Sequence, residues 1–136
     1  MIIFISCTKK KLNKRCKAKE LYTASAWFRK AYKYATSLNP IYIYILSAKY
    51  GLLNENDIIE PYEKTLHGAR ENEIKIWSTK VISQMKEKGI DLEDKAIFLC
   101  GKNYRKYLIP KFKNYEAPLS HLGIGMQMKW LEENTK

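Results

Sequence analysis

Short apolar runs alternate with segments of helical periodicity along this chain. Three runs combine β-branched, aromatic and other apolar residues without a polar interruption: Ile2–Ile5, Ile41–Leu46 and Ala96–Cys100. Runs of this kind predict strands that are buried on both faces of a sheet. A shorter stretch, Tyr115–Pro118, predicts a brief fourth strand.

Apolar residues that recur at intervals of three and four predict the helices. The first helix should begin after Thr23, as its N-cap, and end before Pro40. The segment from Leu52 to Arg70 keeps no period and predicts an ordered loop with one helical turn. The other helices are expected at residues 74–88, about 103–109, and through Met126, Trp130 and Leu131.

This order of elements predicts one α/β domain over residues 1–136, with a small, mostly parallel four-stranded sheet flanked by helices. In such a sheet, ligands bind beyond the carboxyl ends of the strands. Three loops should meet there: Ser6–Lys11, Ser47–Tyr62 and Gly101–Tyr104. We therefore look for function in these loops.

The charge balance favours a polyanionic partner. The chain has 25 Lys and Arg residues against 14 Asp and Glu, a formal net charge of +11, and cations cluster between Lys9 and Lys33, where Glu20 is the only acid. Binding of such a surface to phosphates is driven by the release of condensed counterions. We expect nucleic acid as the partner, DNA rather than RNA, with no obligate protein partner. The alternative is a lysine-rich soluble protein whose charges are only solvated.

Other classes of protein are disfavoured. The sequence has no run of about 18 apolar residues, the length that a membrane-spanning helix needs. The apolar start Met1–Ser6 is too short for the hydrophobic region of a signal peptide. Cys7, Cys16 and Cys100 follow no repeated spacing, which favours free thiols over a disulfide framework or a zinc site. We expect a cytoplasmic protein that needs no metal and no organic cofactor.

The expected crevice collects hydroxyl, thiol and ammonium groups. Lysines and backbone N–H groups after a buried strand suit a phosphate, and a tyrosine can stack on an unpaired base for about 1–3 kcal/mol. The residues predicted to hold a nucleotide are Ser6, Cys7, Ser47, Tyr50, Tyr62 and Tyr104. Those predicted to bind backbone phosphates are Lys9, Lys10, Lys11, Arg29 and Lys49. The alternatives are a solvated lysine turn and tyrosines that belong to the core.

Three residues are candidates for chemistry. Glu60, with Asp57 as a substitute, offers a carboxylate that could stabilise a cation or orient water. His121, just before Gly123-Ile124-Gly125, offers an imidazole that could assist a leaving group. The alternatives are a capping or ion-paired carboxylate and a buried structural histidine.

Several of these motifs together resemble a bacterial and phage family known only as a domain of unknown function. They are Ile5-Ser6-Cys7 with its lysine loop, Leu21-Tyr22-Thr23-Ala24-Ser25, Leu46–Leu53, Glu60-Pro61-Tyr62 and Leu122-Gly123-Ile124-Gly125. That family is distantly similar to the YaaA peroxide-stress proteins, and this similarity implies DNA binding. A weaker similarity in strand order, with His121 after the last strand, is to the uracil-DNA glycosylase superfamily. Those enzymes usually carry Asp or Asn in the first loop, where this chain has Ser6, Cys7 and Thr8.

These observations lead to one hypothesis and two alternatives. The hypothesis is a DNA glycosylase that excises a modified or damaged base, in DNA repair or in defence against phages with modified genomes. Base excision requires a nucleotide turned out of the stack and an oxocarbenium-like sugar that a carboxylate stabilises. The alternatives are a non-catalytic DNA- or RNA-binding module of YaaA type and an enzyme that acts on free nucleotides or nucleosides.

Overall fold

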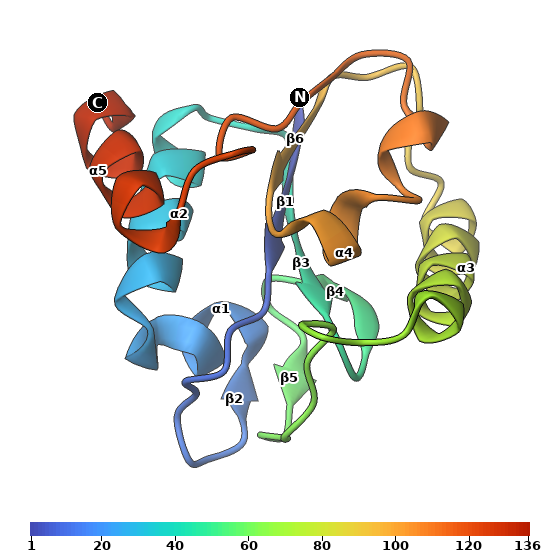
Figure 1. Ribbon diagram of the computed structural model, residues 1–136, viewed down its shortest axis with the longest axis horizontal. Helices are drawn as coiled ribbons and strands as arrows, with labels where there is room; N and C mark the ends of the chain where they lie inside the picture. Colours follow the sequence, from blue (N-terminus) through green and yellow to red (C-terminus); the bar gives the residue numbers. More distant parts are fainter.

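A five-stranded sheet forms the centre of the computed structural model, which describes residues 1–136 (Figure 1). Its strands lie in the order β4-β3-β1-β6-β7, and every neighbouring pair is parallel except β3 and β4. The strands are β1 (Ile2–Ser6), β3 (Tyr42–Ser47), β4 (Gly51–Asn54), β6 (Ala96–Leu99) and β7 (Tyr115–Glu116). The predicted α/β class with a mostly parallel sheet is confirmed, but the sheet has five strands rather than four.

The additional strand, β4, lies at one edge of the sheet and comes from the start of the segment predicted as a loop. It is too short to show a periodicity of its own, and a side chain completes its outer edge. Gln84 accepts a hydrogen bond from the Leu52 N–H (2.8 Å) and donates one to the Tyr50 carbonyl (3.0 Å). Gly51 takes φ = +77°, and a Cβ there would lie 2.2 Å from the Gln84 amide oxygen, so this position favours glycine.

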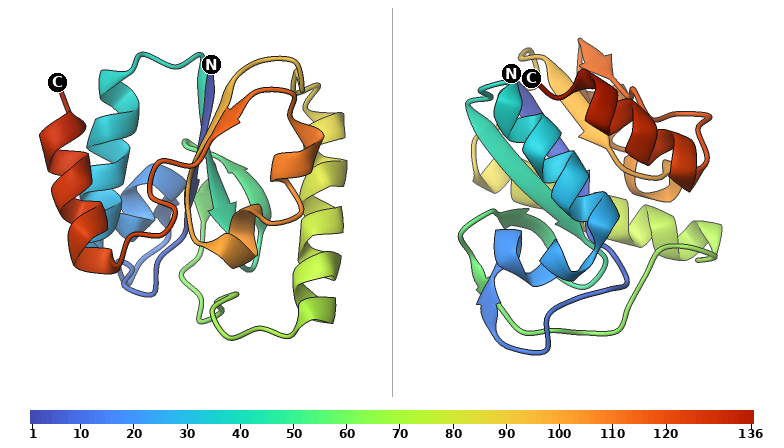
Figure 2. Two further views of the ribbon diagram at one scale, coloured as in Figure 1. Left: turned by 45° about the horizontal axis from the view of Figure 1, so that its top comes forward. Right: turned by 90° about the vertical axis from the view of Figure 1, so that its left-hand side faces the viewer.

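Helices cover both faces of the sheet. Figure 2 shows α2 and α5 packed together on one face and α3 on the other, consistent with the contacts of these elements. The helices of this layer structure are α2 (Ala26–Ser37), α3 (Glu71–Glu87), α4 (Lys102–Arg105) and α5 (Ile124–Asn134). The N-cap of α2 is Ser25 rather than Thr23. The Ser25 hydroxyl accepts from the Phe28 N–H (3.2 Å), whereas the Thr23 hydroxyl donates to the Glu20 carbonyl.

A second, two-stranded sheet lies at the carboxyl end of the parallel strands (Figure 1). It pairs β2 with β5 in antiparallel fashion, and the helix α1 and a 3-10 turn follow β2 directly. The sequence pattern predicts none of these elements, because each is only two to four residues long. They are β2 (Cys16–Lys17), α1 (Ala18–Leu21), η1 (Tyr22–Ala24) and β5 (Ile58–Ile59), and a further 3-10 turn, η2 (Ile109–Lys111), precedes β7.

The core is one cluster of 34 buried residues centred on β1. All five residues of β1 are buried, and its parallel neighbours place Ile45 and Leu99 opposite Ile5. Phe4 stacks on Phe98 with ring centroids 4.9 Å apart. Burial of each such side chain contributes about 1.5–3 kcal/mol. No helix combines the length and the apolar character that crossing a membrane requires.

Candidate functional site

The chain leaves the carboxyl ends of β1 and β6 toward opposite faces of the sheet, which creates the kind of crevice where α/β proteins bind ligands. Three strand ends meet there. The Cys7 Sγ lies 3.4 Å from the Tyr104 hydroxyl and also accepts from the Ala48 N–H at 3.4 Å. The structure therefore brings together the ends of β1, β3 and β6, as the sequence predicts.

A chain of three hydroxyl groups lies beside this crevice. The buried Ser47 hydroxyl donates to the Tyr62 hydroxyl (2.8 Å), which is 2.7 Å from the hydroxyl of buried Tyr22. Backbone N–H groups of Lys49 and Tyr50 donate to Ser47 Oγ and fix it in place. Burial raises the pKa of both tyrosines well above the usual value, so they stay protonated at physiological pH and can donate hydrogen bonds.

Residues 62–67 form a segment that crosses the strand ends and is anchored by buried contacts. The Leu66 N–H donates to the Tyr104 hydroxyl (3.2 Å), and the Asn103 amide donates to the Leu66 carbonyl (2.8 Å). The Leu66 side chain is only 2% exposed. Burial, followed by the proximity of Cys7, raises the pKa of Tyr104. Both ends of the segment are thus fixed, at Tyr62 by hydroxyls and at Leu66 by its backbone.

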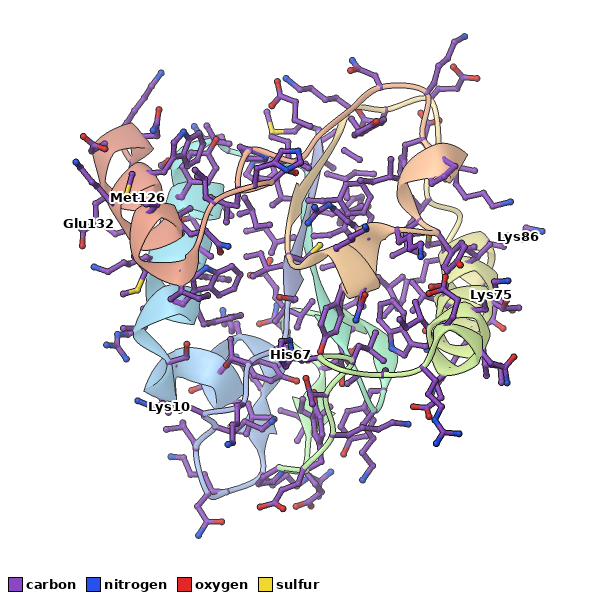
Figure 3. The ribbon with its side chains drawn as sticks, viewed as in Figure 1. Lys10, His67, Lys75, Lys86, Met126 and Glu132 are labelled. Carbon is purple, nitrogen blue, oxygen red and sulfur yellow. The ribbon has the colours of Figure 1, made fainter.

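A cavity of about 600 Å³ lies between this segment and the lysine loop after β1. We call it the Lys11 pocket; its wall includes Lys9, Lys11, Tyr62, Glu63, Lys64 and His67. The Lys11 ammonium group lies over the Tyr62 ring, 4.4 Å from the centroid, in a cation–π contact. Burial lowers the pKa of Lys11, against opposing effects of Cys7 and Glu63. Figure 3 labels His67 and Lys10 in the lower half of the view, where the parallel strands have their carboxyl ends.

The lysines of the Lys11 pocket form no ion pair, because the six ion pairs of the protein involve other side chains. Glu63 is likewise unpaired. The predicted phosphate-binding residues are not all in this place. Lys10 is exposed outside the pocket wall, Arg29 donates to the Thr23 carbonyl (2.6 Å), and Lys49 lines a separate cavity beside α3.

The six nucleotide-holding residues of the prediction lie in three different settings. Tyr62 faces the Lys11 pocket, whereas Ser6, Cys7, Ser47 and Tyr104 are buried beneath it. Tyr50 packs edge-on against Tyr62, with ring centroids 5.5 Å apart, and its hydroxyl donates to the Glu60 carbonyl (3.2 Å). Of the six residues, only Tyr62 lines the Lys11 pocket.

The three predicted catalytic residues lie outside the Lys11 pocket. The Glu60 side chain is 64% exposed, and its carboxylate is 3.9 Å from Arg15 Nε. The Asp57 carboxylate accepts from the Asn54 N–H (2.9 Å) and so closes a turn. His121 is exposed in the loop before α5 with φ = +67°, and its side chain forms no hydrogen bond.

Four residues of the Lys11 pocket are not among the predicted site residues: Glu63, Lys64, Thr65 and His67. They lie in the segment predicted as a loop, within five residues after Tyr62, and no periodicity marks them. Tyr22, whose hydroxyl is 2.7 Å from that of Tyr62, belongs to the Leu21-Tyr22-Thr23-Ala24-Ser25 motif that carries part of the family resemblance. The structure contains no group of three or more His, Cys, Asp or Glu side chains arranged to hold a metal ion.

The fold and this site define an α/β protein with a cationic cavity at the carboxyl edge of a mostly parallel sheet. The chain belongs to DUF6884, a family of unknown function, whose sequence profile matches residues 2–133. No curated protein and no solved structure matches the chain significantly.

Proposed function

We propose that this protein binds DNA and holds a single unpaired nucleotide in the Lys11 pocket. The observation that carries the proposal is a cavity that combines lysines free of ion pairs with a tyrosine ring fixed by a buried hydroxyl chain. A volume of about 600 Å³ is in the range of small-ligand sites, roughly 300–1,000 Å³. The lysines suit phosphate oxygens, and a base would stack on the Tyr62 ring by displacing the Lys11 ammonium group that lies over it.

The charge of the whole chain and the resemblance to the YaaA proteins support DNA as the source of this nucleotide. A net charge of +11 attracts a polyanion over long distances, whereas a free nucleotide needs only a local site. An unpaired nucleotide within a DNA strand presents its base and its phosphates to the same pocket. The Lys11 pocket contains groups for both parts of such a nucleotide: lysines for the phosphates and the Tyr62 ring for the base.

Binding of a labelled single-stranded DNA oligonucleotide, measured by fluorescence anisotropy across a salt series, tests this proposal. Each lysine that neutralises a phosphate of a single strand contributes about 0.7 to the slope of log affinity against log salt, or about fivefold in affinity at 0.1 M salt. Lys9→Gln combined with Lys11→Gln should therefore weaken binding about 25-fold.

The matched control is Lys86→Gln combined with Lys88→Gln, which removes the same charge from the far end of α3 (Figure 3). Both lysines are exposed and form no ion pair, so binding should change little. Equal losses in the two double variants would show that only net charge matters and would exclude the Lys11 pocket. Tighter binding to RNA of the same sequence would contradict the choice of DNA.

Base excision is a second candidate function, favoured by the presence of Glu63 in the same pocket as the lysines. In this reaction the N-glycosidic bond breaks with its electron pair on the base, which takes up a proton. Water then adds to C1′ of the sugar and releases a proton. Glu63 would stabilise the oxocarbenium-like sugar or orient the water, and His67 would protonate the departing base. In this proposal they replace Glu60, Asp57 and His121.

Incubation with DNA that carries modified bases, followed by alkaline cleavage at abasic sites, tests the excision reaction. Glu63→Gln should abolish cleavage, and Glu60→Gln should retain it, because the Glu60 side chain does not line the pocket. The reverse pattern would return the catalytic role to Glu60. If DNA binds in the Lys11 pocket but no modified base is released, the protein is a binding module rather than a glycosylase.

A further inference from the structure

A second cavity, of about 300 Å³, adjoins the Lys11 pocket on the other side of residues 62–67. We call it the Lys80 groove. It lies between the turn after β3 and the first turns of α3, and its wall includes Lys49, Lys64, Glu73, Ile76, Trp77 and Lys80. Lys64 lines both cavities, so one lysine joins them.

The lysines of the Lys80 groove are held in place but not neutralised. The Lys80 ammonium group donates to the Lys49 carbonyl (3.1 Å), and the Lys49 ammonium group lies 5.2 Å from the Tyr50 ring centroid. None of the three groove lysines forms an ion pair, and Glu73 forms none either. Together the two cavities present five lysines against two glutamates, Glu63 and Glu73.

The floor of the Lys80 groove is fixed by the same elements that support the Lys11 pocket. The Trp77 indole N–H donates to the Ser47 carbonyl (2.8 Å), and its ring meets Tyr104 edge-on, with centroids 5.5 Å apart. Ile76, at the rim, is 63% exposed. An exposed apolar side chain between free lysines suits a ligand that has apolar base faces as well as phosphates.

We propose that the Lys80 groove binds the nucleotides that flank the one held in the Lys11 pocket, so that the ligand is a single-stranded DNA segment and not a free nucleotide. The strand crosses residues 62–67 at Lys64, and the phosphates beyond that point lie against Lys49 and Lys80. This inference rests on the proposed nucleotide site. It also decides between two substrate classes, because a mononucleotide fills one cavity and leaves the other empty.

Affinities for thymidine monophosphate and for an oligothymidylate of about 8 nucleotides test the proposal. Lys49→Gln combined with Lys80→Gln should weaken oligonucleotide binding about 25-fold at 0.1 M salt and lower the salt slope by about 1.4. Its affinity for the mononucleotide should not change. Lys9→Gln combined with Lys11→Gln should weaken the binding of both ligands.

The control variants separate failure of this inference from failure of the nucleotide site. If the Lys49 and Lys80 variant loses no more affinity than Lys86→Gln with Lys88→Gln, the Lys80 groove is not on the path of the strand. The Lys11 pocket then stands only if its own variant weakens both ligands. If that variant changes neither ligand, the nucleotide site itself is wrong.

Substitution of Ile76 tests the path of the strand along the Lys80 groove without changing any lysine. Because Ile76 is largely exposed, the folded state should tolerate a polar residue there. Ile76→Glu should weaken oligonucleotide binding and Ile76→Lys should not, while neither alters mononucleotide binding. Equal affinity of the two variants for the oligonucleotide would overturn the proposed path, and thermal unfolding monitored by circular dichroism verifies that both are folded.

Discussion

Residues 55–60 and residues 62–67 belong to the same connection between β4 and α3, but they are held in different ways. The first part is held mainly by its backbone. β5 pairs with β2, the Ala18 N–H donates to the Asp57 carbonyl (2.8 Å), and the Asp57 N–H donates to the Asn54 carbonyl (3.1 Å). The second part pairs with no strand and is held by the side chains of Tyr62, Tyr104 and Asn103.

This difference determines which side chains are available to a ligand. Backbone pairing places the carboxylates of Asp57 and Glu60 at the surface, where one closes a turn and the other faces Arg15. Anchoring at two buried points leaves the intervening side chains of residues 63–65 exposed along a cavity. Glu60 and Glu63 are therefore only three residues apart, but only the Glu63 carboxylate lines a cavity where a ligand could contact it.

The largest effect on the second part is expected from Tyr104→Phe. The variant keeps the ring against Trp77 but leaves the buried Leu66 N–H without its acceptor. An unpaired buried donor costs about 1–3 kcal/mol, so the free energy of unfolding in urea should fall by about 2 kcal/mol. Nucleotide binding should weaken as well, because the wall of the Lys11 pocket is no longer fixed at Leu66.

Tyr107→Phe is the matched control for that variant. Tyr107 is close in sequence, but its hydroxyl contacts the exposed Glu71 carboxylate, so its removal should cost less than about 0.5 kcal/mol. If both variants lose the same stability, the Leu66 N–H is satisfied in another way and residues 62–67 do not depend on Tyr104.

A smaller effect is expected from Tyr62→Phe. The hydroxyl of Tyr62 bonds to Ser47 and Tyr22, and its removal should lower the free energy of unfolding by about 1 kcal/mol, because water can replace part of the contact at a half-buried site. The ring remains but the hydroxyls no longer fix it, so oligonucleotide binding should weaken less than in Tyr104→Phe. Urea unfolding and anisotropy measure the two quantities separately.

Tyr50→Phe provides the comparison for Tyr62→Phe, since the Tyr50 hydroxyl donates only to an exposed carbonyl, that of Glu60. Its loss should alter neither stability nor binding beyond experimental error. A Tyr62→Phe protein as stable as Tyr50→Phe would mean that the hydroxyl chain is not an anchor of the second part.

The sequence predicts the elements with long apolar patterns and the place where their ends converge. The runs at Ile2–Ile5, Ile41–Leu46 and Ala96–Cys100 correspond to β1, β3 and β6, because burial on both faces leaves a continuous apolar signal. The strands β2 and β5 leave no such signal, since two residues cannot show a period. Their pairing depends on contacts between segments about forty positions apart in the chain.

Site residues, too, can be placed from the sequence only where they lie next to a long strand. Residues at the end of a long strand or directly after it, such as Ser47 and Cys7, lie where expected because the strand fixes their position. Glu63 and Lys64 lie nine and ten residues beyond Asn54, where β4 ends, and only tertiary contacts of Tyr62 and Leu66 place them. Asp57 and Glu60 are acids in the same segment, and nothing in the sequence distinguishes them from Glu63.

The smallest effects are expected in the first part of the connection. Asp57→Ala removes the acceptor of the Asn54 N–H in an exposed turn, so the free energy of unfolding should fall by about 0.5 kcal/mol. Glu60→Gln should change the free energy of unfolding by less, because an exposed ion pair contributes little.

Oligonucleotide binding should remain unchanged in Asp57→Ala, whereas Glu63→Gln should strengthen it slightly by removing a negative charge from the Lys11 pocket. Anisotropy titrations of the three variants at low salt compare the two parts directly. If Asp57→Ala or Glu60→Gln alters binding more than Glu63→Gln does, the ligand contacts the first part, and the distinction between the two parts of this connection does not hold.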